Sequence, residues 1–231
     1  MTLPRLRALG RLALFLWGLG FSGLALAHDV AEADAAFVRA TDGPAFIPFA
    51  YLGAKHMVTG IDHVLFLVGV VFYLFRLRDV LLYVSMFAIG HTVTLMGGVL
   101  LGVEANAHIV DAIIGMSVVY KAAENLGLLK KIGVAIDSRA AVFAFGLAHG
   151  MGLATKLLQL HPAANGLVAN LVGFNVGVEI GQVLVLTFVV TLLNLLRRAP
   201  GFAVGARVAN IALVIAGLVL TALQIGKFAR A

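Results

Sequence analysis

Residues 56–75 read HMVTGIDHVLFLVGVVFYLF, an apolar run that opens with two histidines and an aspartate. A run this apolar is typical of a segment buried in lipid, where ionisable side chains are costly and usually functional. The rest of the chain has the same character, because 61% of its 231 residues are hydrophobic and 12% are charged. A soluble domain carries about 25% charged residues. The composition therefore predicts an integral, all-α membrane protein.

Six apolar segments predict one polytopic bundle of six transmembrane helices over residues 46–231. Each is long enough for a bilayer core of about 30 Å. The first and fifth segments exceed one straight span, so we expect each to be tilted or broken at a glycine. The segments are approximately 46–75, 80–101, 107–129, 140–160, 166–196 and 204–226.

The N-terminus has the layout of a secretory signal peptide. Residues 1–27 combine an arginine-rich start, an apolar stretch and the small-residue ending Ala25-Leu26-Ala27. This pattern predicts cleavage after Ala27, and an uncleaved first transmembrane helix is the alternative. Residues 28–45 are short and polar, which predicts a periplasmic arm.

The charges of the loops predict the orientation. The loops at 76–79, 130–139 and 197–207 are basic, whereas those at 102–106 and 161–165 contain no lysine or arginine. Because basic loops face the cytoplasm, the mature N-terminus is expected on the periplasmic side.

A weak internal sequence similarity between the two halves suggests a 3+3 inverted repeat of the kind found in some transporters. The frame F-x-x-G occurs at Phe87 in FAIGH and again at Phe174 in FNVGVE, 87 residues later. The same offset aligns Asp62 with His149. Chance matches are common in apolar sequence rich in glycine and phenylalanine, so the repeat stays a hypothesis at this stage.

The polar residues of the first span indicate a metal site. His56 and His63 share one helical face, with Cα atoms about 10.5 Å apart in a straight helix. This distance is long for two imidazoles on one ion, so we expect either a bend at Gly60 or ligands from other spans. Asp62 is expected as an outer partner of a ligand or as a ligand from the side. The alternative is an interfacial helix start that Asp62 caps.

Further ionisable residues lie inside later spans. His91 and His149 are near the middle of the second and fourth spans, and Glu179 is deep in the fifth without a base within one turn. An unpaired carboxylate at this depth is expected to be protonated or to meet a cation. The candidate metal ligands are His56, Asp62, His63, His91, His149 and Glu179, with His28 as an additional candidate. Candidate pathway or structural residues are Thr94, Lys121, Glu124, Asn175 and Gln182.

The chemistry of this set favours a borderline divalent ion. The chain has no cysteine, and imidazole with carboxylate suits Ni²⁺, Co²⁺, Zn²⁺ or Fe²⁺ better than Cu⁺. No phosphate-binding loop, dinucleotide fingerprint or HExxH motif is present in the sequence.

Three motifs resemble the HupE/UreJ family of bacterial membrane proteins, in particular its HupE/UreJ-2 branch. They are HMVTGIDHVLF, which meets the family pattern H-x5-D-H, FAIGHTVTL and FGLAHGMG. The resemblance implies uptake of nickel or cobalt for hydrogenase and urease. The family's nickel permeases are similar to F-H-G-x-A-H-G-x-E in the later motif. Phe145 and Gly152 stand where that pattern has a histidine and a glutamate, and we expect Glu179 to supply a carboxylate instead.

We therefore expect an inner-membrane permease or channel for a divalent transition-metal ion, most plausibly nickel or cobalt, rather than an enzyme. The alternatives are a membrane metalloprotein, acting as a metal-binding enzyme or as an accessory protein for a metalloenzyme, and a purely structural subunit. The expected partners are the metal ion as substrate and the lipid bilayer, without nucleic acid. A homo-oligomer and metalloenzyme-maturation proteins are further candidate partners.

Overall fold

The computed structural model describes residues 32–230, which form helices joined by short loops and contain no strand. The predicted all-α class is therefore confirmed. The predicted signal peptide and His28 lie outside the described residues. The helices are α2 (Glu32–Ala40), α3 (Phe46–Thr59), α4 (Ile61–Val71), α5 (Leu77–Leu101), α6 (Ala107–Asn125), α7 (Leu128–Lys131), α8 (Ser138–Leu158), α9 (Leu167–Leu196) and α10 (Phe202–Phe228).

Within residues 32–230, four helices are individually long and apolar enough to cross a membrane: α5, α8, α9 and α10. The pair α3 and α4 would make a fifth span, bent by 65° at Gly60. The first expected span is thus broken at a glycine, whereas the fifth is one continuous helix of 30 residues. The helix α6 carries Asp111, Lys121 and Glu124 within 19 residues and is not among these candidates. The protein is a multi-pass membrane protein, and the count of six spans stays a prediction.

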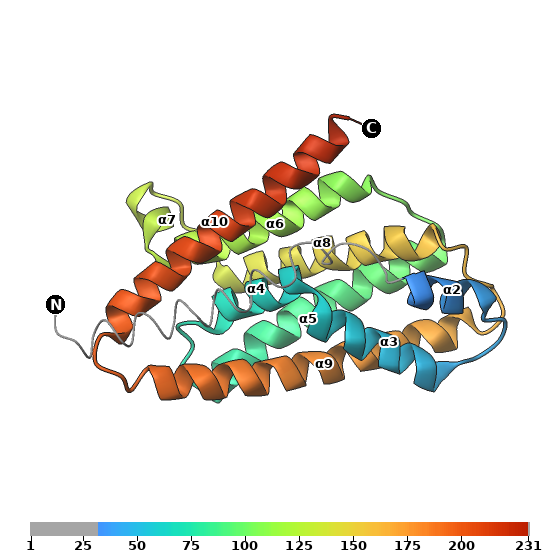
Figure 1. The fold of residues 1–231 in the computed structure, drawn as a ribbon, viewed down its shortest axis with the longest axis horizontal. Coiled ribbons are helices and arrows are strands. Elements are labelled where there is room, and N and C mark those ends of the chain that lie inside the picture. Colours follow the sequence, from blue (N-terminus) through green and yellow to red (C-terminus); the bar gives the residue numbers. More distant parts are fainter. Residues whose placement is uncertain (1–31, 231) are drawn as a thin grey trace.

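The bundle is built from three closely packed helix pairs: α3 with α9, α5 with α8, and α6 with α10 (Figure 1). Small residues permit this packing because they let two backbones approach each other. On α9, a glycine stripe lies directly on the backbone of α3, and a Cβ at Gly177 would overlap the carbonyl oxygen of Ala50. The contacts of this stripe are Gly173 with Phe46, Gly177 with Ala50, and Gly181 with Ala54.

The short helix α4 lies between these pairs, and nine of its eleven residues are buried. It contacts α3, α5, α6, α9 and α10. The guanidinium of Arg197, just after α9, donates hydrogen bonds to the carbonyls of Val71, Phe72 and Leu74 at 3.1, 2.8 and 2.9 Å. These carbonyls belong to the last residue of α4 and the turn after it, where a helix end leaves carbonyls without intrahelical partners. Arg197 therefore fixes the end of the helix that carries Asp62 and His63.

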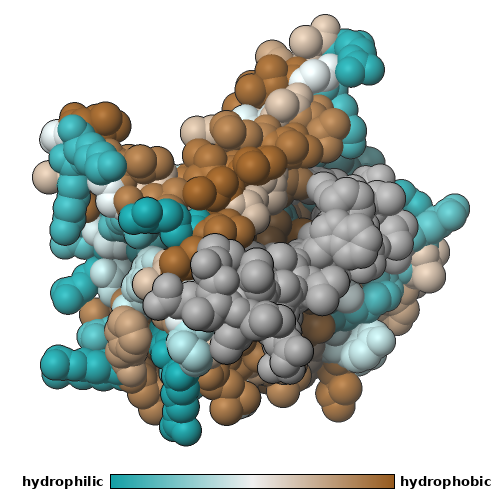
Figure 2. Space-filling model, turned by 60° about the vertical axis from the view of Figure 1, so that its left-hand side comes forward, coloured by the Kyte–Doolittle hydropathy of each residue, from teal (hydrophilic) through white to brown (hydrophobic). Residues whose placement is uncertain are grey.

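The outer surface of the bundle is largely apolar, as Figure 2 shows for one face, with hydrophilic residues gathered toward its margins. Exposed side chains such as Leu81 on α5, Val183 on α9 and Ile215 on α10 contribute to this surface. Contiguous exposed apolar surface is typical of contact with lipid. The loops at one end of the bundle, on the left in Figure 1, and the helix turns next to them form what we call the basic end. Its residues are Arg76, Arg78, Lys130, Lys131, Arg139, Arg197, Arg198 and Arg207.

Candidate metal site

Four histidines from four helices meet in the interior of the bundle, with His63 of α4 at the centre. The centroid of its ring lies 4.9 Å from that of His56 on α3 and 4.9 Å from that of His149 on α8. The ring of His91 on α5 is 6.1 Å away. Asp62 precedes His63 and is also buried. We call His56, His63, His91 and His149 the histidine cluster.

The break at Gly60 makes this cluster possible. Gly60 ends α3 and begins α4 with an extended backbone (φ −70°, ψ 99°), and its N–H donates to the His56 carbonyl at 2.8 Å. A Cβ at Gly60 would lie 2.9 Å from both the His56 carbonyl oxygen and Nδ1 of His63. The bend that the spacing of the two histidines suggested is therefore present, and it places their rings in contact.

Two of the histidines are held in one tautomer by their neighbours. Nδ1 of His63 donates to Oδ1 of Asp62 at 3.1 Å, and Nδ1 of His149 donates to the carbonyl of Phe145 at 2.8 Å. A neutral imidazole with a proton on Nδ1 presents a free lone pair on Nε2. Ligating histidines typically donate their other ring nitrogen to a carboxylate or a backbone carbonyl. Both histidines therefore have the Nδ1 hydrogen-bond partner that a metal-ligating histidine usually has. Asp62 accepts this hydrogen bond from His63, which is where the outer partner of a ligand would stand.

Five further ring nitrogens of the cluster are buried without a hydrogen-bond partner. They are Nε2 of His56, His63 and His149, and both ring nitrogens of His91. A buried polar group left unsatisfied costs about 1–3 kcal/mol. These nitrogens are the feature of the site that most requires an explanation.

The spacing of the rings suits a shared ion, although their present orientation does not. With metal–nitrogen bonds of about 2.1 Å, imidazoles around one tetrahedral ion have centroids about 5 Å apart. The observed separations of 4.9–6.1 Å are close to this value. Within residues 32–230, however, no three histidine, aspartate or glutamate side chains converge so as to hold an ion as they stand.

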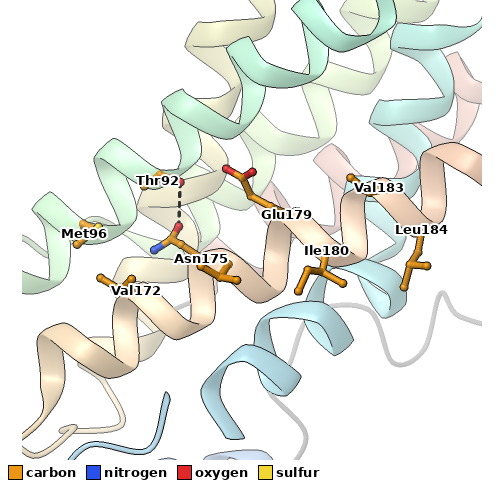
Figure 3. Close-up of a pocket in the computed structure, with 9 residues that line it drawn as sticks. Thr92, Met96, Val172, Asn175, Glu179, Ile180, Val183 and Leu184 are labelled. Carbon is orange, nitrogen blue, oxygen red and sulfur yellow. Dashed lines mark hydrogen bonds between the residues drawn. The ribbon is translucent and has the colours of Figure 1, made fainter. Parts of the chain in front are cut away.

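The structure does not bring Glu179 to the histidine cluster. Glu179 is exposed on the outer side of α9, in a groove of about 650 Å³ between α9 and α5 (Figure 3). Beside it, the hydroxyl of Thr92 donates to Oδ1 of Asn175 at 2.9 Å and links the two helices. The glycine stripe turns the opposite face of α9 toward α3, so the face with Glu179 is left on the outside.

The other polar residues considered from the sequence connect helices. The hydroxyl of Thr94 donates to the Leu147 carbonyl on α8 at 2.7 Å, and Nε2 of Gln182 donates to the Val84 carbonyl at 3.5 Å. Nζ of Lys121 donates to Glu124 at 2.5 Å and to the hydroxyl of Ser138 at 2.9 Å. Lys121 and Glu124 therefore form an internal ion pair, and together with Asn175 these residues have clear structural partners.

One ion pair near the cluster was not expected from the sequence. Nζ of Lys156 on α8 lies 3.1 Å from both carboxylate oxygens of Asp111 on α6, and Asp111 is 5% exposed. Lys156 follows His149 by seven residues and shares its helical face. This spacing is the signal that could have linked Lys156 to the site.

Comparisons with known proteins add one finding. Residues 32–230 match the family described as HupE / UreJ protein, which covers most of the chain. No curated protein and no solved structure matches the chain.

Proposed function

Because this chain belongs to the HupE/UreJ family, we propose that it is an inner-membrane permease for a divalent transition-metal ion, nickel or cobalt. The family is associated with nickel and cobalt transport or with the maturation of urease and hydrogenase. Its members are transporters or accessory proteins rather than enzymes. Within these classes, the properties of the histidine cluster favour a permease.

The buried, unpartnered ring nitrogens are the observation that carries the proposal. A bundle interior that needs only packing fills such positions with apolar side chains, because each unsatisfied nitrogen lowers stability. A cation would satisfy these lone pairs, and neutral imidazole is a preferred ligand of nickel and cobalt. Rotation of the rings about their side-chain torsions is the change that would aim them at a common ion.

The arrangement around His63 supports stepwise passage. His63 is central, so it can share an ion with His56 on one side of its ring. On the other side it can share the ion with His149 and His91. Incomplete ligand sets bind an ion favourably and release it readily, which conduction requires. Asp62 would hold the His63 ring in place and increase its basicity while the ion moves. Glu179 is not part of this proposed set.

The directions of the paired helices support the expected six spans. His108 bonds Gln224 near one end of α6, and Asn125 bonds Asn210 near the other. The helix α6 therefore runs antiparallel along α10 and reaches a similar depth, with its charged residues paired. We infer that α6 is the third span. We also retain the cleaved signal peptide and a periplasmic mature N-terminus in this proposal.

Reciprocal glycine contacts support the inverted repeat. A Cβ at Gly53 would strike the Phe174 carbonyl, as a Cβ at Gly146 would strike the Phe87 carbonyl. In this correspondence, α3 is equivalent to α8 and α9 to α5, so the pair α3–α9 maps onto the pair α8–α5. Phe87 and Phe174 keep the offset of 87 residues that the F-x-x-G frames have in the sequence. Gly53 and Gly146 are 93 residues apart.

This correspondence relates His149 to His56, which is also 93 residues away, in place of the Asp62 that an offset of 87 residues would pair with it. The ion would then pass between two equivalent helix pairs, one carrying His56 and the other carrying His91 and His149. Rocking of two such pairs about a central site is how inverted-repeat transporters expose the site to each side in turn.

Metal binding and uptake by His63→Ala test the proposal. Replacing the central ligand should weaken binding by more than the roughly 10- to 100-fold that outer partners contribute, and should abolish uptake of radioactive nickel or cobalt by cells. His108→Ala is the matched control, because this histidine also lies within the bundle but bonds Gln224 at 3.0 Å. Binding and uptake by His63→Ala equal to those of the control would reject the proposal.

One observation favours an accessory protein as the second candidate. Five ring nitrogens of the cluster are buried from solvent in this conformation, as they would be in a protein that retains its ion for a partner. A stoichiometric ion that survives chelation of the purified protein, without uptake in cells, would favour this reading over a permease.

A further inference from the structure

We propose that three phenylalanines, Phe66, Phe87 and Phe145, form the gate that closes the path between the histidine cluster and the basic end. The proposal rests on the proposed function, since it concerns the route by which the ion would leave or enter the cluster. We call these three residues the phenylalanine layer.

The layer follows from a regular placement along three helices. Each phenylalanine shares a helix with one histidine of the cluster and lies one turn closer to the basic end, because α4 ends there while α5 and α8 begin there. Positions three or four residues apart lie on the same helical face. The pairs are His63 with Phe66, His91 with Phe87, and His149 with Phe145.

Contacts between the rings close the layer. The centroid of Phe66 is 5.3 Å from that of Phe87 and 5.8 Å from that of Phe145. The His149 ring lies directly against the layer, 5.5 Å from Phe66 and 5.0 Å from Phe87. Aromatic rings at 4.5–7 Å are in packing contact, and Phe66 and Phe87 are 0% and 1% exposed. Phe66 therefore packs on both other rings of the layer, and in this proposal these contacts are the closed state of the gate.

An apolar constriction of this kind gates ions through their hydration. It excludes water, and an ion entering it would lose its water ligands without gaining others. Polar groups resume beyond the layer, since Tyr120 of α6 packs on Phe145 at 5.3 Å and the neighbouring Lys121 pairs with Glu124. The layer therefore separates two polar regions of the path.

The opposite side of the cluster has a related but smaller barrier. There, Phe174 of α9 lies 5.9 Å from the His56 ring. Phe174 corresponds to Phe87 in the inverted repeat, so the contact of Phe174 with His56 corresponds to that of Phe87 with His149. Phe66 and Phe145 add two further rings to the barrier, and both lie on the side of the cluster that faces the basic end.

Thiol labelling tests the layer without any metal. The chain has no cysteine, so His91→Cys introduces a single thiol into the cluster, and a charged methanethiosulfonate reagent is applied to either side of the membrane. Adding Phe66→Ala or Phe145→Ala should accelerate labelling from the basic end on the order of tenfold, a barrier lower by about 1.4 kcal/mol. A separate Lys130→Cys protein identifies which side that is.

Phe72→Ala is the matched control, because Phe72 is 1% exposed but packs on Phe202, at 6.3 Å, rather than on the cluster. It creates a comparable buried cavity and should leave the labelling rate unchanged. Phe145 is only half-buried, so its variant keeps the test decisive if Phe66→Ala fails to fold. Labelling in both layer variants no faster than in the control overturns the proposal.

Ion flux into proteoliposomes separates the gate from the proposed function. Wild type should admit Ni²⁺ or Co²⁺ but not Mg²⁺, which prefers oxygen ligands and gains little from imidazole in exchange for its water. In the layer variants with intact histidines, a wider, wetted constriction should let hydrated Mg²⁺ pass as well. If labelling accelerates but wild type passes no nickel or cobalt, the barrier stands and the permease proposal fails. If wild type passes these ions and the layer variants change neither labelling nor the Mg²⁺ leak, the gate is wrong and the permease stands.

Discussion

The substitution Gly60→Ala tests whether the helix break positions the metal site. The backbone of Gly60 has φ −70° and ψ 99°, at the edge of the broad β region that alanine adopts without strain. In the folded state the effect of the substitution therefore comes from the contacts of one added methyl group. In the unfolded state the loss of chain freedom stabilises the alanine variant by about 0.4–1 kcal/mol.

The size of the effect follows from those contacts. The new Cβ would lie 2.9 Å from the His56 carbonyl oxygen, 2.9 Å from Nδ1 of His63 and 3.2 Å from Oδ1 of Asp62. Comfortable contacts between nonbonded heavy atoms are about 3.5–4.0 Å, so the His63 ring must move away by several tenths of an ångström. Such overpacking costs about 1–3 kcal/mol of folding stability. Because the movement disturbs the hydrogen bond from His63 to Asp62, metal affinity should also fall about 10- to 100-fold.

Calorimetric titration with Ni²⁺ and Co²⁺, together with thermal unfolding in detergent, measures both effects. The control is Gly97→Ala on α5, where an added Cβ has no atom within 4 Å. Alanine is favoured over glycine inside a helix by about 1 kcal/mol, so the control should be neutral or slightly stabilising. If Gly60→Ala binds metal as tightly as Gly97→Ala does, the break does not position His63 and the reasoning fails.

Three further substitutions probe single contacts. Asp62→Asn keeps an oxygen near His63 but removes its charge, so titration should show metal binding about 10- to 100-fold weaker; unchanged affinity would exclude Asp62 as an orienting partner. Glu179→Gln should leave affinity unchanged because Glu179 is exposed on the outer groove, and a clear loss would return it to the ligand set. Asp111→Asn leaves the ammonium of Lys156 without its carboxylate partner and should lower the free energy of unfolding by about 3 kcal/mol. Replacing both residues of that pair with leucine should recover much of this loss, and a double variant as unstable as the single one would contradict the explanation.

Local features of the fold could be predicted from the sequence. Helix geometry alone shows that His56 and His63 are too far apart in a straight helix to share an ion. This distance predicted a bend between them, and the structure has that bend at Gly60. The glycines at four-residue intervals on α9 are likewise visible in the sequence as one face of small residues, which favours close packing. Both features depend on distances along one helix, which the sequence defines.

The position of Glu179 required the tertiary structure. Periodicity places Asn175, Glu179 and Gln182 on one face of α9, but it does not say what lies opposite that face. Because α3 occupies the glycine stripe, Glu179 faces the outer groove, whereas Gln182 reaches the backbone of α5. The expectation that this carboxylate joins the histidines assumed that a polar residue deep in a span points inward.

The histidine cluster is separable from the contacts that hold the bundle together. Glycine stripes join α3 to α9 and α5 to α8 through backbone contacts, and Arg197 fixes the end of α4. None of these contacts uses an imidazole, so the rings can change orientation without loosening the helices that carry them. Five ring nitrogens of the cluster are buried without a hydrogen bond, each at a cost of about 1–3 kcal/mol. Because independent contacts hold the helices, the rings can turn toward an ion when it binds and turn back when it leaves. Reversible binding inside a membrane requires this freedom.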